Sequence, residues 1–358
     1  MNFNFYLLKS FRILLLPFSL IYGLIVIVRN SLFDKNFIKS VSFNLPIIGV
    51  GNLSVGGTGK SPMVEYLISL LHNRYNVATL SRGYKRRTTG YALANADTTT
   101  LEIGDEPMQF HRKFSDVAVA VGEERIVAIP QLLHDRPQTD VIILDDSLQH
   151  RRIKPAFNIL LTDCSNLFTR DFFLPTGDLR DQKSSYKRAD VIVVTKCPAD
   201  ISLADMDRIK AEIKPLATQQ VFFTTIEYGS PYNIISKEKK AFSPEYEVLL
   251  VCGIANPQPL KNYLAQQVKS YYQLSYADHH IFSIDDLDEI SNKFAEMNAE
   301  RKIIITTEKD AVRLVKFKEA LLHIPVYVLP VQHKFLGGRG IQFDDIVNTF
   351  IETFQDKK

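Results

Sequence analysis

One stretch decides the fold of this chain: Asn52-Leu53-Ser54-Val55-Gly56-Gly57-Thr58-Gly59-Lys60-Ser61. A short apolar run, Ile47 to Val50, comes before it and is typical of a buried strand. After it, apolar residues recur at helical spacing, at Val64, Leu67, Ile68 and Leu71. A strand, a glycine-rich turn, Gly-Lys-Ser and a helix, in this order, predict a phosphate-binding P-loop.

The residues of this loop have separate predicted roles in binding a nucleoside triphosphate. Backbone N–H groups from Ser54 to Ser61 surround the phosphates, because glycines let the backbone approach an anion and the helix N-terminus adds partial positive charge. Lys60 reaches the β- and γ-phosphates, and the Ser61 hydroxyl binds Mg²⁺. Ser54 stands where the usual pattern has glycine. An ordinary glycine-rich turn with an incidental lysine is the alternative, and the context on both sides favours the P-loop.

Composition bounds the class of protein. The 358 residues suffice for two domains, and 46% hydrophobic with 23% charged residues indicates a folded chain. A net charge of +3 is too small to indicate a nucleic-acid partner. The three cysteines, Cys164, Cys197 and Cys252, match neither a metal-ligand spacing nor a disulfide framework. The chain therefore suits a reducing cytoplasm.

Residues 1–40 predict contact with a membrane. Ile13 to Val28 carries no charge, is flanked by Arg12 and Arg29, and is shorter than the ~20 residues of a spanning helix. No small-residue cleavage pattern follows, so a signal peptide is disfavoured. A buried core helix and a helix lying in the membrane interface remain. The basic flanks and nearby aromatic residues favour the interface, with membrane lipid as a partner.

From residue 41 onward the pattern predicts an α/β fold with a mostly parallel sheet. Apolar runs without alternation indicate strands buried on both faces. They are Ile47–Val50, Val77–Leu80, Val117–Val121, Val141–Leu144, Ile159–Leu161 and Val191–Val194. We assign 41–225 to a P-loop nucleotide-binding domain, 226–247 to a linker, and 248–358 to a smaller C-terminal α/β domain that closes over the site.

Several polar residues follow the strands of the first domain. Asp145 and Asp146 end an apolar strand, where P-loop proteins place the carboxylate that holds Mg²⁺; a helix cap is the alternative. Gln149 follows them and can line the same site. Arg82 lies in a basic loop, 81–87, that is either an anion site or a solvated basic face.

Three further segments carry candidate residues. Asp105, in Gly104-Asp105-Glu106-Pro107, can accept a proton from an attacking hydroxyl or simply start a helix. Arg180 is presented by a turn at 175–181. His279 and His280 follow Asp278. They can be metal ligands, they can form a general-base dyad with that aspartate, or they can be surface polar residues.

Six motifs in one order resemble those of the tetraacyldisaccharide 4'-kinase family, the lipid A kinases of Gram-negative envelope synthesis. They are Gly51–Lys60, Ser81–Tyr84, Gly104–Pro107, Asp145–His150, Asp278–His280 and Thr307–Val312. The resemblance covers nearly the whole chain. It departs from the family at Ser147, where glycine is usual, and at Asp181, where glutamate is usual.

The resemblance implies a function, cofactors and roles. Such kinases bind the cytoplasmic face of the inner membrane, peripherally or monotopically, and transfer the γ-phosphate of ATP to the 4'-hydroxyl of an acylated glucosamine disaccharide 1-phosphate, forming lipid IVA. On this chain it makes Asp105 the general base and His279, favoured over His280, its partner. ATP and Mg²⁺ are the implied cofactors, and Arg180 lies near the lipid.

A regulatory P-loop NTPase acting on a protein partner at the membrane is the alternative. A guanine-specific switch needs Lys-x-Asp after a late strand, and here Pro198 follows Lys196 and Cys197 in place of the aspartate. The interfacial helix and the Asp105–His279 pair also fit a lipid kinase better.

Overall fold

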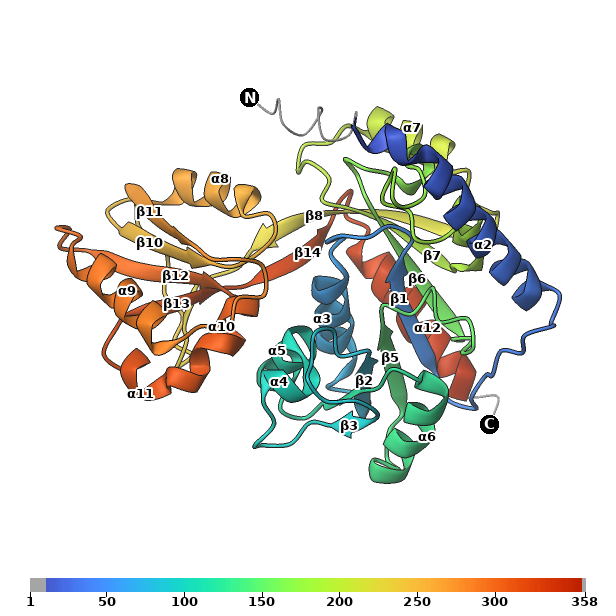
Figure 1. Cartoon of the computed structure of the whole chain (residues 1–358), viewed down its shortest axis with the longest axis horizontal. Coiled ribbons are helices and arrows are strands. Elements are labelled where there is room, and N and C mark those ends of the chain that lie inside the picture. The colour runs from blue at the N-terminus through green and yellow to red at the C-terminus, as the bar shows by residue number, and fades with distance from the viewer. Residues whose placement is uncertain (1–10, 356–358) are drawn as a thin grey trace.

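Two β-sheets, with helices on both faces of each, lie side by side along the longest axis of the molecule (Figure 1). The structure is a computed structural model and describes residues 11–355. The larger sheet has the strand order β14-β8-β7-β6-β1-β5-β2-β4-β3. Its strands are β1 (Ile47–Asn52), β2 (Val77–Ser81), β3 (Ala92–Leu93), β4 (Ala118–Val121), β5 (Val141–Asp145), β6 (Phe157–Asp163), β7 (Val191–Thr195), β8 (Gln220–Tyr228) and β14 (Val331–Phe335).

This sheet is parallel except at its edges, where β3 pairs antiparallel with β4 and β14 with β8. Its strands are buried on both faces, as their continuous apolar runs predict. One face packs on α3 (Lys60–Leu71), α5 (Asp105–Lys113) and α12 (Gly340–Gln355), and the other on α6 (Arg125–Asp135) and α7 (Leu203–Ile213). The short α4 (Thr100–Ile103) precedes α5. The α/β fold class is confirmed.

The smaller sheet has the order β11-β10-β12-β13-β9. Its strands are β9 (Tyr232–Asn233), β10 (Glu247–Cys252), β11 (Ser270–Ser275), β12 (Lys302–Thr307) and β13 (Val326–Leu329). The helices of this unit are α8 (Gln258–Gln267), α9 (Ile284–Ala295), α10 (Glu308–Leu314) and α11 (Lys318–Leu321). Four short 3₁₀ turns lie at Ile13–Leu15, Phe168–Arg170, Lys183–Arg188 and Val315–Phe317 in the described part of the chain.

The C-terminal residues differ from the predicted domain boundaries. Strand β14 pairs with β8, and α12 buries Phe343, Val347 and Ile351 in the core of the larger sheet. The boundary 248–358 is therefore wrong at its end, because Val331–Gln355 returns to the first unit. The predicted linker 226–247 likewise contains the end of β8 and all of β9. An apolar stripe at i, i+4 and i+8 on α12 can cover any sheet, and only packing shows which one.

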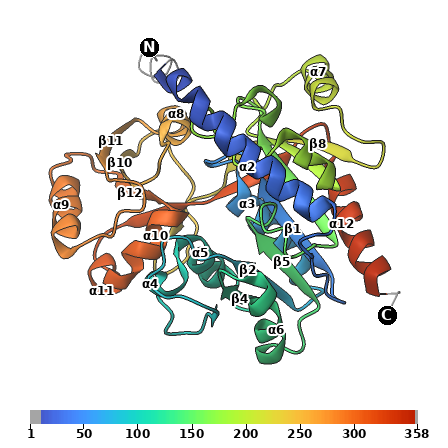
Figure 2. The same ribbon diagram turned by 45° about the vertical axis from the view of Figure 1, so that its right-hand side comes forward.

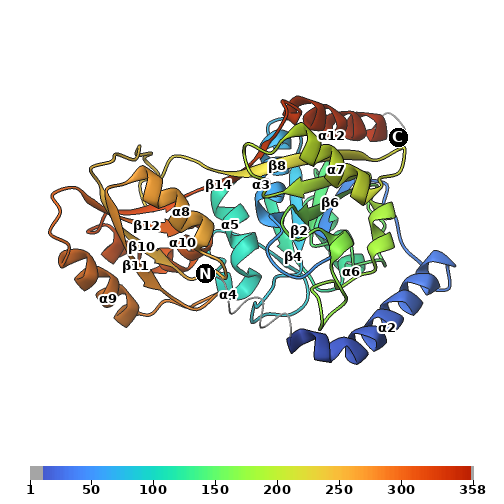
Figure 3. The same cartoon turned by 90° about the horizontal axis from the view of Figure 1, so that it is seen from above.

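Helix α2 (Leu16–Asp34) lies along one side of the larger unit (Figure 2 and Figure 3). The face turned to the protein contains small or polar residues at heptad spacing, including Ser19, Gly23 and Asn30. A Cβ added at Gly23 would lie 2.6 Å from the Phe173 ring, so glycine permits this close packing. Asn30 Nδ2 donates to Asp181 Oδ1 at 2.7 Å.

Most apolar side chains of α2 point away from the protein, and Val26 and Phe33 are the buried exceptions in this helix. Ile21, Leu24 and Ile25 are each about 60% exposed. The buried-core alternative is therefore wrong. Residues Ile13–Asp34 form the one helix in the described range 11–355 that is long and apolar enough to cross a membrane by length and composition.

Candidate active site

The P-loop lies between the end of β1 and the start of α3. Gly56 and Gly59 have φ values of 100° and 85°, which favour glycine. Gly59 is the N-cap of α3, and no side chain among residues 11–355 caps this helix end. Its free N–H groups are therefore available to an anion.

A network of charged side chains lies beside the loop. Strand β5 pairs with β1 so that Asp145 is opposite Val50, which places the two aspartates next to the P-loop. Lys60 Nζ is 3.6 Å from Asp146 Oδ1. Arg180 donates to both carboxylate oxygens of Asp146, with Nη1 2.7 Å from Oδ2. Asn52 Oδ1 accepts from Lys60 and from Arg180. Asn52 is part of the P-loop stretch quoted from the sequence, but the sequence analysis predicted no function for its side chain.

The two aspartates differ in acidity. Burial, and then the charge of Asp146, raise the pKa of Asp145 to about 6. Burial opposes ionisation of Asp146 too, but hydrogen bonds from Arg180 and the Lys60 charge lower its pKa to about 2. Asp145 Oδ1 is buried and has no hydrogen-bond partner among the described residues. A buried carboxylate oxygen of this kind fits a divalent cation, and oxygen ligands suit Mg²⁺. The Ser61 hydroxyl is the third candidate ligand, at the first turn of α3.

Asp105 and His279 meet across the boundary between the two units. Asp105 is the first residue of α5, and its Oδ2 lies 2.7 Å from His279 Nδ1. Arg313, on α10, donates to the same oxygen at 2.7 Å and has a side chain only 4% exposed. Burial opposes ionisation of Asp105, but His279 and Arg313 outweigh it and lower the pKa of this carboxyl. Asp105 is therefore held as a carboxylate.

The neighbouring histidine has a different partner. His280 Nε2 lies 2.9 Å from Asp286 Oδ2, and its ring stacks on Tyr276. Asp286 belongs to the capping box that begins α9. The geometry thus places His279, and not His280, beside Asp105.

Further ion pairs join α5 to α10. Lys309 donates to Glu106 at 2.6 Å, and Lys113 donates to Glu308 at 2.7 Å. Lys113 also donates to Glu65 on the P-loop helix. These pairs connect the second unit to both helices that carry the candidate site. Sequence reasoning gave none of them a role, although the Thr307–Val312 motif contains Glu308 and Lys309.

The candidate substrate residues lie in different environments. Gln149 Nε2 donates to the Asn52 carbonyl at 2.7 Å, and the Gln149 carbonyl accepts from Arg29 of α2. Arg180 is bound to Asp146, so it lies at the candidate metal site, and its carbonyl accepts from Tyr22 of α2. Arg82 is exposed, whereas Arg86 in the same loop pairs with Glu123 and has a side chain that is only 2% exposed. The loop is therefore a basic surface with one structural arginine.

Two further positions lie in this region: Arg125, which the sequence reasoning missed, and Asp181, which it noted only as a departure from the family pattern. Arg125, 2% exposed, donates to the Asp145 carbonyl at 3.2 Å and contacts His150. Burial lowers the pKa of Arg125 to about 10. Asp181, the departure from the family pattern, is 1% exposed and accepts from Asn30 and Arg188, so its role here is to hold α2. A lone arginine at a helix start gave no signal in the sequence.

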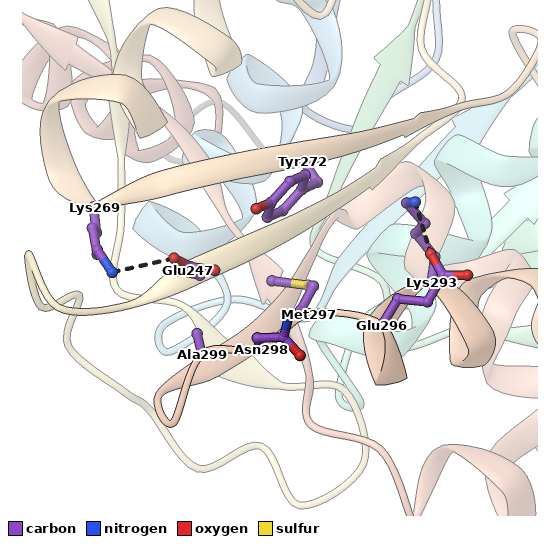
Figure 4. Close-up of a pocket in the computed structure, with 8 residues that line it drawn as sticks. All are labelled: Glu247, Lys269, Tyr272, Lys293, Glu296, Met297, Asn298 and Ala299. Carbon is purple, nitrogen blue, oxygen red and sulfur yellow. Dashed lines mark hydrogen bonds and ion pairs between the residues drawn. The ribbon is translucent and has the colours of Figure 1, made fainter.

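A separate pocket of about 380 Å³ lies at the outer edge of the smaller sheet (Figure 4). It is lined by Glu247, Lys269, Tyr272, Lys293, Glu296, Met297, Asn298 and Ala299. Its two lysines are paired, Lys269 with Glu247 at 3.3 Å and Lys293 with Glu296 at 2.9 Å. It contains none of the candidate site residues, so we assign no chemistry to it.

Transfer of a phosphoryl group requires that phosphates be positioned, that their charge be neutralised, and that a hydroxyl lose a proton. The P-loop and its neighbouring carboxylate pair fit the first two needs, and a carboxylate in contact with a histidine, as at Asp105 and His279, fits the third. The fold and the site therefore define a P-loop phosphotransferase.

Comparison with known proteins identifies the family. The family model described as "Tetraacyldisaccharide-1-P 4'-kinase" (LpxK) matches residues 11–351, and the chain belongs to this family. The tetraacyldisaccharide 4'-kinase of Flavobacterium johnsoniae is 47% identical over 344 residues, covering 95% of this chain and 97% of the relative. That of Parabacteroides distasonis is 43% identical over 355 residues, covering 96% of each. The predicted class, an ATP-binding kinase, is confirmed.

A solved structure agrees with this assignment. The crystal structure of LpxK from Aquifex aeolicus, described as an "apo" form in complex with ATP, has a TM-score of 0.74 to this chain. It is 29% identical in sequence, and the match covers 95% of this chain and 99% of that one.

Proposed function

We propose that this protein transfers the γ-phosphate of ATP to the 4'-hydroxyl of an acylated glucosamine disaccharide 1-phosphate. The single observation that carries the proposal is the contact of Asp105 with His279 in a chain that matches the family from residue 11 to 351. It supplies a base for a sugar hydroxyl, in addition to the P-loop that a simple NTPase also has.

The residues divide the chemistry between them. The loop from Ser54 to Ser61 and Lys60 bind the phosphates, with Ser61, Asp145 and Asp146 as ligands for Mg²⁺, which would neutralise phosphate charge. Asp105 accepts the proton of the 4'-hydroxyl as its oxygen bonds to the γ-phosphorus. The bond from that phosphorus to the β–γ bridging oxygen breaks, and ADP leaves with the electron pair. General-base catalysis of this kind contributes ~10²–10⁴-fold in rate.

The remaining candidates position the substrates. His279 orients the Asp105 carboxylate through the 2.7 Å contact between its Nδ1 and Asp105 Oδ2. Arg180 and Gln149 lie beneath α2 and bind polar groups of the lipid, and Arg82 binds a phosphate at the exposed loop. The unit at 229–330 closes on the P-loop unit about the β8–β14 ribbon and excludes water, a competing acceptor.

The proposal places the enzyme on the cytoplasmic face of the inner membrane, where ATP is present. The apolar face of α2 enters the lipid layer from that side, and its polar face stays on the protein. An acylated substrate then reaches the Arg180 side of the site without leaving the membrane. Nucleic acid has no role in this function.

The test uses the full chain in detergent with γ-labelled ATP, Mg²⁺ and a lipid A disaccharide 1-phosphate. Label on the lipid, lost in Lys60→Ala and Asp105→Ala, is the expected result. Label released only as free phosphate, at a rate indifferent to the lipid, would overturn the proposal in favour of a regulatory NTPase.

A further inference from the structure

Two consecutive carbonyl groups of the P-loop are held by side chains from elsewhere in the fold. Thr195 Oγ1, at the end of β7, donates to the Thr58 carbonyl at 2.9 Å. His333 Nε2, in β14, lies 2.8 Å from the Gly59 carbonyl oxygen. A phosphate-binding loop must direct its N–H groups toward the anion, so its carbonyls must point the other way. These two contacts hold that orientation.

The hydrogen bonds of His333 define its protonation. A carbonyl oxygen only accepts, so Nε2 must carry the proton. Nδ1 lies 2.9 Å from Thr224 Oγ1, and it therefore accepts from that hydroxyl when the ring is neutral. The pKa of His333 is lowered to about 4, mainly by burial. The ring is therefore neutral at physiological pH.

The two hydrogen-bond partners of His333, Thr224 and Gly59, come from different parts of the fold. Thr224 is in β8 and His333 in β14, and these strands form the antiparallel ribbon that leads from the larger unit to the smaller one (Figure 1). Gly59 belongs to the nucleotide loop. A Cβ added at Gly59 would lie 2.9 Å from His333 Cε1, so the glycine also admits the imidazole.

We propose that His333, together with Thr195, is a positioning residue for nucleotide binding: it fixes the P-loop with its N–H groups toward the phosphates and ties this conformation to the ribbon between the two units. His333 touches neither ATP nor lipid and acts through the Gly59 carbonyl. ATP binding and the position of the ribbon are thereby coupled, in both directions.

Two amide substitutions separate the contacts of His333. Glutamine places its N–H₂ where Nε2 lies, so His333→Gln keeps the bond to Gly59. Asparagine is shorter and reaches only Thr224. We expect His333→Asn to weaken ATP binding roughly three- to tenfold, the effect of one hydrogen bond, and His333→Gln to restore it. Binding is measured directly with labelled ATP and full-length protein in detergent, without lipid, so the result does not depend on the identity of the acceptor.

The control is Phe335→Leu, on the same face of β14, where the ring packs on Tyr66 of α3 and makes no hydrogen bond to the loop. It should lower the unfolding temperature and leave ATP affinity unchanged. In turnover assays, His333→Asn should raise KM for ATP and leave KM for the lipid unchanged. Equal ATP affinity in the glutamine and asparagine variants would overturn the proposal.

A second pair keeps the proposal testable if a His333 variant fails to fold. Thr195→Ser retains the hydroxyl that binds the Thr58 carbonyl, and Thr195→Val removes it, so only the valine variant should bind ATP more weakly. Hydrogen exchange tests the coupling: ATP should slow exchange of the β14 amides in the natural chain and not in His333→Asn. Equal affinity of the two Thr195 variants, or β14 exchange indifferent to ATP, would contradict the proposal.

Discussion

Replacing Glu65 by glutamine should change how the stability of the protein depends on pH. Glu65 lies on the P-loop helix and is 4% exposed. It shares the single ammonium group of Lys113 with Glu308, which is also buried. Burial, and then the negative charge of Glu308, raise the pKa of Glu65 from 4.5 to about 7. Two buried carboxylates and one lysine leave an excess negative charge when both are ionised.

The sign and size of the effect follow from this pKa. A carboxyl whose pKa is higher in the folded state stabilises the fold when protonated, below pH 4.5, and that contribution is lost as pH rises through 7. The difference corresponds to about 3 kcal/mol of unfolding free energy, at 1.36 kcal/mol per pKa unit. Glutamine stays neutral at every pH. The unfolding free energy of Glu65→Gln should therefore increase by about this amount, relative to that of the natural chain, as pH rises from 5 to 8.

Thermal unfolding of the full chain in detergent, at pH 5, 6, 7 and 8, measures the effect. The unfolding temperature of Glu65→Gln relative to the natural chain should rise by about 4 °C over this range, given the unfolding entropy expected for 358 residues. The control is Glu296→Gln, an exposed carboxylate on the surface side of the smaller unit, which should follow the natural chain at every pH. Parallel pH curves for Glu65→Gln and the natural chain would refute the reasoning, because Glu65 would then titrate as an ordinary carboxyl.

Three other predictions follow from the site and from α2. Asp105→Asn should lower kcat by ~10²–10⁴-fold and leave ATP affinity unchanged, measured by turnover and by nucleotide binding; equal loss in both would assign Asp105 a structural role. Because the pKa of Asp145 is about 6, the Mg²⁺ concentration for half-maximal rate should rise as pH falls from 7.5 to 5.5; no change would argue against Asp145 as a ligand. Gly23→Leu should push α2 off the Phe173 ring and raise KM for the lipid without changing ATP affinity. Leu24→Asp, on the exposed face of α2, should reduce flotation of the protein with lipid vesicles. Unchanged flotation would contradict the membrane role of that face.

The sequence determined the elements whose signals are local. The P-loop, its flanking strand and helix, and the strand ending in Asp145 and Asp146 lie where the residue pattern predicted them. Strands buried on both faces have continuous apolar runs, and a helix has a 3.6-residue period, so a short window is sufficient to identify each. The apolar N-terminal run was visible too, but its periodicity alone did not show which face the protein covers.

The tertiary structure alone decided which distant residues meet. Asp105 and His279 are 174 residues apart, and no spacing rule relates them. The return of β14 and α12 to the larger sheet, and the contact of His333 with Gly59 across 274 residues, likewise depend on strand pairing and packing. Local patterns specify which face of an element is apolar or which residue can donate. Which partner lies opposite is settled only when the whole chain packs, because burial is favourable for many pairings and the chain topology selects among them.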